Sequence, residues 1–349
     1  MFSNSTPLWE SGGASVRGAT HRRSGTPNQD AWNKWQSDSL YALAVADGHG
    51  STKSFRSDRG ARMAVESAIK IVSEFLQDKE LHLPRSLQEL CETGLHGKFV
   101  STWSQQVDSD LASDAFSSQE RETLVQHSGD GAWTSVEKNP RLAYGSTLLV
   151  AAISPEFVAF WQLGDGDILT VSPDGKTVSR PIPEDPSLIA NETTSLCMAN
   201  ATQQFRTGLS LADDKMPLPL LILLSSDGYA NSFVSPKAFD QVATDLLAFI
   251  QKQGFGSVCA KLDDWLNETS AEGSGDDVTV GLLWNRTEPT TKPTPANSSP
   301  NGATDDSPEQ RSGLSTLPDQ SPEGAPETTP PNLPNNTSHD SFTQPRNLP

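Results

Sequence analysis

The sequence predicts an α+β domain that combines antiparallel strands with amphipathic helices. Tight turns join apolar, strand-like runs within residues 146–163 and 168–175, and strands joined in this way form antiparallel hairpins. Residues 55–76 and 86–107 instead place apolar side chains at every third or fourth position, as amphipathic helices do. Several other short apolar runs end in aspartate and glycine, which is typical of buried strands closed by turns.

Composition divides the 349-residue chain into one domain and a tail. We expect residues 1–285 to form the domain, since that length can bury a sizeable core. Residues 286–349 hold about half of the 25 prolines, together with many serines, threonines and asparagines. Such a segment cannot bury enough apolar surface to offset the entropy lost on ordering. The tail is therefore expected to be a disordered linker whose hydroxyl side chains are potential kinase targets.

The formal net charge of −18 argues against nucleic acid and anionic membranes as partners, because both are polyanions. An acidic protein can still act on phosphate if a metal ion supplies positive charge. Cys91, Cys197 and Cys259 are far apart in sequence, which fits a reducing compartment and excludes a zinc ribbon. The first residues lack the pattern of a signal peptide, and no apolar run reaches the length of a membrane span. We therefore expect a soluble, cytoplasmic protein.

The first elements bring two aspartates to neighbouring strand ends. Residues 9–21 are expected to contain a strand with a glycine bulge, and 21–32 to form a loop that delivers Asp30. Residues 41–46 are a continuous apolar run that predicts a strand buried on both faces, and Asp47 follows it directly. A rigid strand end next to glycine suits a metal ligand. Taken alone, Asp47 is equally well explained as a turn residue, and Asp30 is better explained as one.

The middle of the chain alternates between regular and irregular patterns. After the two predicted helices, residues 108–141 are polar and aperiodic, and we expect them to form a surface insertion. The hairpins follow, and Gly-Asp-Gly-Asp at 164–167 lies at the end of one of their strands. Residues 180–215 are again polar and contain three prolines, so that we expect a long surface flap.

The last third repeats the combination of strand and aspartate. Residues 218–224 form an apolar strand pattern that ends in Ser-Ser-Asp-Gly, and Ser235 then caps a helix that Pro236 opens. A second helix is expected around 258–266. Gly-Ser-Gly-Asp-Asp then leads into a strand pattern at 278–284.

Aspartates thus recur at predicted strand ends, and they would repel one another unless a cation lay between them. Hard oxygen ligands without a cysteine or histidine cluster favour Mg²⁺ or Mn²⁺ over Zn²⁺. Two such ions can lower the pKa of a shared water and direct it at phosphorus. The sequence contains no P-loop, nucleophile elbow or dinucleotide fingerprint. The residues alone predict a two-metal carboxylate site, formed by Asp30, Asp47, Asp165, Asp227 and Asp276.

Six motifs occur in a fixed order: NQDA at 28–31, VADGHGS at 45–51, YGSTLLVA at 144–151, LGDGD at 163–167, LLSSDGYANSF at 223–233 and SGDDVTV at 274–280. Together they resemble the bacterial-type PPM (protein phosphatase 2C) family over roughly residues 10–285. The resemblance implies a four-layer α-β-β-α sandwich with two antiparallel sheets. It also implies metal-dependent hydrolysis of phosphoserine and phosphothreonine in proteins, by a water that two Mn²⁺ or Mg²⁺ ions activate.

The resemblance also assigns roles to the aspartates. Asp47 corresponds to the carboxylate that bridges both metals, with the Gly48 carbonyl oxygen on one of them. Asp227 and Asp276 would complete the coordination of the first metal. Asp30 would hold metal-bound waters, either directly or through hydrogen bonds.

Three further assignments concern the third metal, the proton and the phosphate. Asp165 is similar to the carboxylate that supports a third, weaker metal, and His49 to the proposed general acid for the leaving alkoxide. A hydrogen-bonded turn histidine is the alternative for His49. The family's phosphate-binding arginine lies five residues before the first aspartate, where this chain has Gly25, and the candidates to replace it are Arg22 and Arg23.

Two more departures affect the metals. Gln29 stands where the family often has glutamate, so one carboxylate is lost and the affinity for the second metal is left open. Asn231 stands where an aspartate helps to bind the third metal, so we expect weaker third-metal binding. The expected partners are phosphorylated protein substrates and a cognate Ser/Thr kinase, and the expected oligomeric state is a monomer. Two alternatives stay open: a catalytically weak or inert domain that binds partners, and a hydrolase of small phosphoesters.

Overall fold

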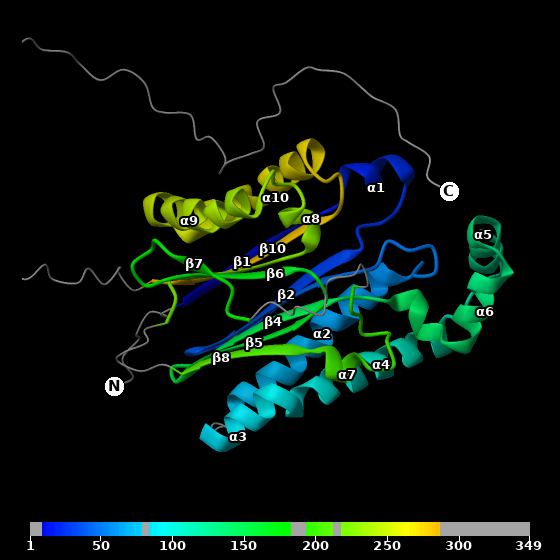
Figure 1. Ribbon diagram of the computed structural model, residues 1–349, viewed down its shortest axis with the longest axis horizontal. Helices are drawn as coiled ribbons and strands as arrows, with labels where there is room; N and C mark the ends of the chain where they lie inside the picture. The colour runs from blue at the N-terminus through cyan, green and yellow to red at the C-terminus, as the bar shows by residue number, and fades with distance from the viewer. Residues whose placement is uncertain (1–8, 79–83, 183–192, 212–217, 287–349) are drawn as a thin grey trace, which may run out of the picture.

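The computed structural model describes residues 9–78, 84–182, 193–211 and 218–286, and it places two five-stranded antiparallel sheets face to face with helices on both outer sides (Figure 1). Sheet A contains, in spatial order, β1 (Trp9–Val16), β10 (Val278–Asn285), β9 (Leu221–Ser225), β6 (Asp167–Val171) and β7 (Val178–Ser179). Sheet B contains β2 (Asp30–Ser37), β3 (Leu40–Asp47), β4 (Leu148–Ile153), β5 (Phe157–Leu163) and β8 (Arg206–Leu211). The predicted α+β sandwich is confirmed.

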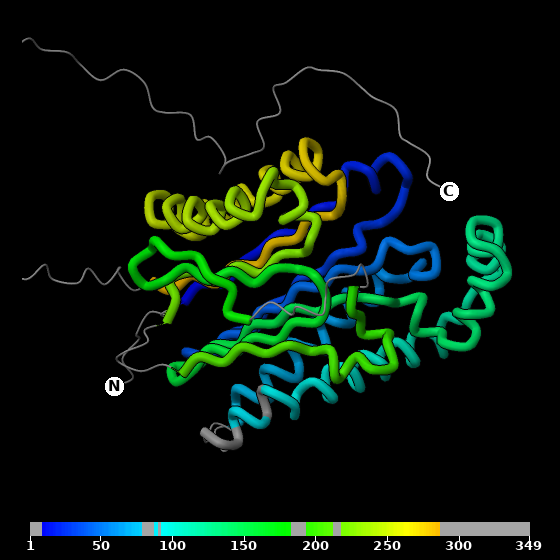
Figure 2. The backbone as a smooth tube through the Cα atoms, viewed as in Figure 1, coloured from blue at the N-terminus to red at the C-terminus, as the bar shows by residue number. Residues whose placement is uncertain are grey.

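Four long helices form the outer layers, and Figure 2 shows them running along the sheets. Sheet B is covered by α2 (Ser57–Gln77) and α4 (Leu95–Ser113), and sheet A by α9 (Pro236–Gln253) and α10 (Phe255–Glu272). The shorter helices are α1 (Ala19–Ser24), α3 (Pro84–Glu89), the π-helix η2 (Leu90–Gly94), α5 (Ser118–Ser128), α6 (Asp130–Lys138), the 3-10 helix η3 (Pro140–Tyr144), α7 (Ala201–Gln204) and α8 (Asp227–Ala230). None of the helices in the described ranges is long and apolar enough to cross a bilayer.

Strand β3 is buried on both faces, as its continuous apolar run predicts. Its odd-numbered side chains lie in the core between the two sheets, whereas its even-numbered alanines pack in the core that α2 and α4 share with sheet B. Alanine is small enough to let α2 lie close to this face. Both neighbours of β3 in the sheet, β2 and β4, pair with it in regular antiparallel register. The end of the strand, at Asp47, is therefore held rigidly.

The helical layer over sheet B is fixed by one close backbone approach. A Cβ atom at Gly60 would lie 1.9 Å from the carbonyl oxygen of Tyr144, so that only glycine fits there. The Gly60 carbonyl also accepts a hydrogen bond of 3.0 Å from the indole of Trp103, which is fully buried. These contacts join α2, α4 and η3 just below the segment that follows β3.

Two predicted irregular segments contain regular structure. Within the predicted surface insertion at 108–141, α4 continues to Ser113, and α5 and α6 follow, so the aperiodic sequence forms helices. Helix α5 buries only Leu124, which explains why its sequence shows no apolar period. Within the predicted flap, residues 201–211 form α7 and the edge strand β8, so that part of the prediction is wrong. Residues 183–192 and 212–217, and the predicted tail from 287 onward, lie outside the described residues.

The predicted loop at 21–32 is also wrong in part. Helix α1 occupies Ala19–Ser24, and β2 begins at Asp30 and pairs with β3 along its whole length. The sequence pattern did not indicate strand β2, because in its outer half the exposed polar side chains of Lys34 and Gln36 alternate with half-buried Trp35 and Ser37. The predicted hairpins β4–β5 and β6–β7 and the capped helix α9 are confirmed.

Candidate metal centre

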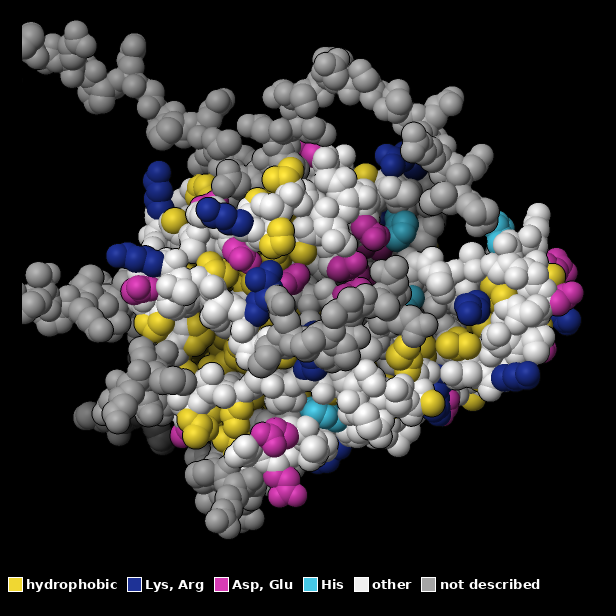
Figure 3. All heavy atoms as spheres, viewed as in Figure 1, with side chains coloured by type: hydrophobic (Ala, Val, Ile, Leu, Met, Phe, Trp, Pro, Cys, Tyr) yellow, Lys and Arg dark blue, Asp and Glu magenta, His cyan; other side chains and the backbone are white. Residues whose placement is uncertain are grey.

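Four of the predicted aspartates converge at one end of the sandwich, where strands of both sheets end. The register of β2 and β3 places Asp30 directly opposite Asp47. Asp227 follows β9 and Asp276 precedes β10, and these two strands are neighbours in sheet A. Burial raises the pKa of Asp47 well above its usual range, and the nearby carboxylates of the other three raise it further. Figure 3 shows acidic side chains gathered on this face, with histidine beside them.

Asp30 is the most deeply buried member, with 7% of its surface exposed. One carboxylate oxygen, Oδ2, accepts a hydrogen bond of 2.6 Å from Ser226, and the other, Oδ1, is buried without a partner among the described residues. Burial raises the pKa of Asp30 to about 7, with a smaller contribution from nearby carboxylates, while the Ser226 hydrogen bond acts in the opposite direction. The unpartnered oxygen is free to accept from a metal-bound water or to bind a cation directly.

The backbone around Asp47 is clamped from both sides. The amide of Asp47 donates to the hydroxyl of Thr147 at 2.9 Å, and the amide of Thr147 donates to the Asp47 carbonyl at 2.8 Å. The amide of Gly48 donates to the Gln29 carbonyl at 3.0 Å, and a Cβ at Gly48 would lie 2.6 Å from the Ser57 carbonyl oxygen. The Gln29 side-chain amide donates to the Ser57 hydroxyl at 2.6 Å. Where the resemblance leads one to expect a glutamate, this chain therefore has the amide of Gln29, which donates a hydrogen bond to the first residue of α2.

Asp227 and Asp165 form the outer part of the group. Burial raises the pKa of Asp227, and repulsion from Asp165 and Asp276 adds to the effect, although a hydrogen bond with Asp47 opposes it. The side-chain amide of Asn231 donates to the Asp227 carboxylate at 3.1 Å. Asp165 is exposed and accepts a hydrogen bond of 2.6 Å from Thr193. The structure therefore places Asp165 near the other aspartates but on their solvent side.

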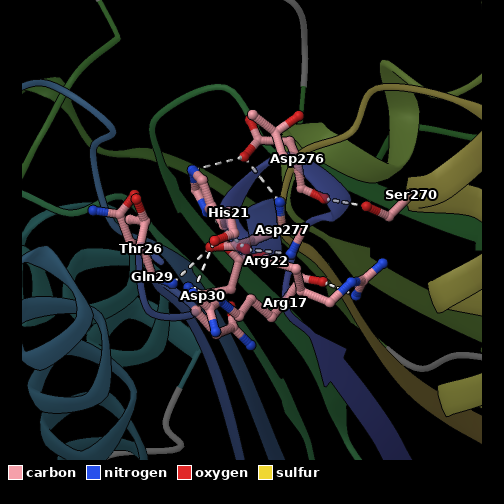
Figure 4. A network of polar contacts seen from close by, with 12 residues as sticks. Arg17, His21, Arg22, Thr26, Gln29, Asp30, Ser270, Asp276 and Asp277 are labelled. Atoms are coloured by element: carbon pink, nitrogen blue, oxygen red, sulfur yellow. Dashed lines mark hydrogen bonds and ion pairs between the residues drawn. The ribbon is translucent and has the colours of Figure 1, made fainter. Parts of the chain in front are cut away.

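A sixth aspartate, Asp277, is part of this network and was not predicted. It is 4% exposed, and its carboxylate accepts hydrogen bonds from the backbone amides of Gly18 at 2.5 Å and Gln29 at 2.6 Å. Figure 4 shows His21 beside it, with the imidazole Nδ1 2.9 Å from an Asp277 oxygen and Nε2 3.9 Å from Asp276. The only sequence signal was the doubled aspartate before β10. Because both oxygens of Asp277 bind backbone amides, this residue holds the α1–β2 segment in place.

The structure does not bring the two predicted phosphate-binding arginines to the aspartates. Arg22 donates to the Asn267 side chain at 2.8 Å and to a backbone carbonyl, and Arg23 donates to the Thr20 hydroxyl at 3.1 Å. Gly25 ends α1 in the left-handed region, with φ of 83°. That conformation disfavours arginine, which explains why glycine stands at the position five residues before Asp30.

His49 lies next to Asp47 with its backbone fixed. Its amide donates to the Gly145 carbonyl at 3.0 Å, and its imidazole packs against Gly145, where a Cβ would lie 2.7 Å from the ring. Burial lowers the pKa of His49, and the carboxylate of Asp165 acts in the opposite direction. No hydrogen bond to the ring nitrogens is formed by the part of the chain that the structure describes. The imidazole is thus positioned at the centre without an internal partner.

Comparisons with known proteins concern the family and the fold of the chain. A family model described as protein phosphatase 2C matches residues 17–267, which is more than half of the chain. The serine/threonine phosphatase Stp1 from Staphylococcus aureus matches with a TM-score of 0.50 at 13% identity, covering 81% of this chain and 99% of that one. A serine/threonine phosphatase from S. agalactiae matches with a TM-score of 0.48 at 16% identity, covering 79% of this chain and 99% of that one. The phosphatase PstP/Ppp from Mycobacterium tuberculosis has a TM-score of 0.45 at 14% identity, with coverage of 79% and 98%.

A search of curated proteins returned no match. At these identities the similarity to the Staphylococcus aureus structure concerns the fold, whereas the family model concerns the sequence itself. The chain belongs to the protein phosphatase 2C family, and its enzyme class is that of the protein serine/threonine phosphatases.

Proposed function

We propose that this protein hydrolyses phosphoserine and phosphothreonine in other proteins with two bound Mn²⁺ or Mg²⁺ ions. The observation that carries the proposal is the convergence of Asp30, Asp47, Asp227 and Asp276, where burial and neighbouring carboxylates raise the pKa of Asp30, Asp47 and Asp227. A carboxylate cluster with raised pKa values and an unpartnered buried oxygen fits a hard divalent cation.

The residues that would hold the metals are those to which the family resemblance assigns this role. Asp47 would bridge the two ions, the Gly48 carbonyl would bind one of them, and Asp227 and Asp276 would complete the first coordination sphere. Asp30 would bind metal-held waters through its free oxygen, and Asp165 would support a weaker third ion from the solvent side. When bound, the ions supply charge to the phosphate and lower the pKa of an attacking water.

The chain's own residues organise the rest of the reaction. Attack of water on phosphorus breaks the bond to the serine or threonine oxygen, and this leaving oxygen must take up one proton. His49 is the residue that we assign to donate it, because it follows Asp47 and Gly48 directly in the chain and no described residue forms a hydrogen bond with its ring nitrogens. The clamps on Asp47 and Gly48 keep the carboxylates in place before substrate arrives.

The test is an activity assay of the full chain on a phosphothreonine peptide in EDTA, Mg²⁺ or Mn²⁺. We expect turnover only with added metal, and a loss of at least about 100-fold in Asp47→Asn and Asp227→Asn. Asp264→Asn, on the exposed face of α10, is the matched control and should keep full activity. A folded wild-type chain that binds metal but hydrolyses neither peptides nor small phosphoesters would instead support a partner-binding module.

The proposed partners follow from the reaction. Phosphoprotein substrates require a Ser/Thr kinase in the same compartment, which we propose to be the cytoplasm. Localisation of the tagged chain by cell fractionation tests this, and recovery outside the cytoplasm would contradict it. We also propose a monomer, and light scattering that gave twice the mass of the chain would contradict that.

A further inference from the structure

A cleft of about 540 Å³ opens beside the metal centre, between α1 with its following loop and helix α5. In Figure 1, α1 lies above the ends of the sheets, and α5 stands beyond them at the far side of the segment after β3. The floor of the cleft is formed by residues of this segment, namely 50–52, 54 and 55. A volume of this size holds a few amino-acid side chains.

The cleft adjoins the metal centre, because the imidazole of His21 in its lining lies 3.9 Å from a carboxylate oxygen of Asp276. His21, Gln29 and Gly50 belong to its lining. Gln29 directly precedes Asp30, and Gly50 follows His49. A phosphorylated residue whose phosphate reached the aspartates would therefore bring its neighbouring residues into the cleft.

Helix α5 is held firmly as the outer wall. Arg56, which is 3% exposed, donates from Nε to one Glu120 oxygen at 2.6 Å and from Nη2 to the other at 3.0 Å. The hydroxyls of Thr52 and Ser128 are 2.6 Å apart and join the floor to the far end of α5. A buried bidentate pair of this kind fixes both distance and orientation. The wall is thus formed before any ligand binds, which lowers the entropic cost of binding.

The lining carries almost no net charge. It contains neither lysine nor arginine, and its one carboxylate, Glu120, is paired with Arg56. Hydroxyl, amide and glycine groups make up most of the rest, with Phe55 and Leu124 as apolar contacts and two histidines at the rim. A lysine, arginine or glutamate side chain that entered would lose hydration without gaining a partner of opposite charge.

We propose that this cleft binds the residues that flank the phosphorylated serine or threonine of a protein substrate, and that it selects uncharged side chains there. The inference rests on the proposed function and adds to it a preference for substrate sequence. The α5–α6 insertion is then the element that distinguishes phosphoproteins by the residues next to their phosphate.

The test uses variants that place a larger or charged side chain in the cleft and leave the residues of the metal centre unchanged. Thr123 is exposed on the face of α5 that lines the cleft, so Thr123→Trp fills it without charge and Thr123→Lys places a cation in it. Gln126→Lys adds the same charge to the same helix outside the lining and is the matched control. Because both positions are exposed, folding should be unaffected.

Two readouts are compared, each with the full chain in Mn²⁺. The first is kcat/KM for a phosphothreonine peptide with uncharged flanking residues, set against p-nitrophenyl phosphate, which has no flanking residues. The second is the Kd of the same peptide carrying a non-hydrolysable phosphonate, measured by fluorescence anisotropy. We expect both Thr123 variants to weaken peptide binding and kcat/KM by about 10-fold through KM, with p-nitrophenyl phosphate hydrolysis within about two-fold of wild type.

Gln126→Lys should match the wild type in every readout. The wild-type protein should bind peptides with lysine or glutamate flanks about 10-fold more weakly than the peptide with uncharged flanks. Unchanged peptide binding in both Thr123 variants would overturn the inference. Inhibition by an unphosphorylated peptide of residues 289–300 that Thr123→Trp abolishes would also overturn it, by assigning the cleft to the chain's own C-terminal segment. If the wild type hydrolyses neither substrate, the proposed function fails, whereas the anisotropy result still decides the role of the cleft.

Discussion

Replacing Asp277 with asparagine tests whether this unpredicted aspartate organises the metal centre. Its two oxygens accept short hydrogen bonds from the amides of Gly18 and Gln29, and asparagine keeps only one of these acceptors. The other amide would face an NH₂ group, which cannot accept. Hydrogen bonds to charged groups contribute about 1.5–3 kcal/mol each, so the loss should cost about 2–3 kcal/mol.

An opposing effect must be subtracted from this cost. The charge of Asp277 contributes to the raised pKa of Asp30, and its removal relieves that repulsion. Between partly screened groups the relief amounts to about 1 kcal/mol. Direct hydrogen bonds therefore outweigh the repulsion, and the net loss should be about 1–2 kcal/mol, or roughly 3–6 °C in Tm for a domain of this size.

The assay is denaturant unfolding of the full chain in EDTA, with Asp264→Asn as the exposed control. The control should stay within about 0.5 kcal/mol of the wild type. An Asp277→Asn variant that is as stable as the wild type, or more stable, would refute the reasoning, because it would mean that repulsion dominates at this position.

The remaining predictions concern stability under metal-free and variant conditions. In EDTA, burial raises the pKa of Asp30 to about 7 in the folded chain from its ordinary value of 3.8 in the unfolded chain. The folded state therefore binds more protons, and stability should fall as pH rises between these values. Urea unfolding from pH 4 to 8 should show a fall on the order of 2–4 kcal/mol that Mn²⁺ removes, and a stability that rises with pH would contradict this. Gly60→Ala should cost at least about 2 kcal/mol in thermal unfolding because its Cβ overlaps the Tyr144 carbonyl, and a neutral result would disprove that packing. Arg56→Met should cost about 3 kcal/mol and increase protease cleavage in α5, because Glu120 loses its partner; unchanged cleavage would show that α5 is held by other contacts.

Most strands and helices, and the aspartates at the strand ends, could be predicted from local patterns. Aspartate and glycine directly after apolar runs identified Asp47 and Asp227, because buried strands leave a clear signal and a rigid end. The resemblance to a known family then supplied the two-sheet arrangement, which brings the ends of β3 and β9 together. No local pattern alone specifies which strand ends meet.

The other features of the site depend on contacts between distant parts of the chain or on backbone conformation, which the sequence pattern does not show. Asp277 and His21 are neighbours only because β10 and α1 meet in space, and residues 256 positions apart leave no shared pattern. Gly25 has a positive φ because it ends α1, and the sequence pattern did not predict this short helix. Without the helix, Arg22 and Arg23 were expected to lie in a loop that reaches the phosphate. Helix α5 is fixed by polar contacts rather than an apolar face, and for that reason its sequence resembled an irregular segment.

The central claim is that the strand-end aspartates form a two-metal centre, and titration calorimetry of Mn²⁺ into the EDTA-treated, dialysed full chain tests it directly. Two tight sites and a weaker third are predicted for the wild type, and Asp47→Asn should lose both tight sites because it removes the bridging carboxylate. Asp264→Asn should bind as the wild type does. Absence of tight binding, or tight binding that Asp47→Asn leaves unchanged, would contradict the account.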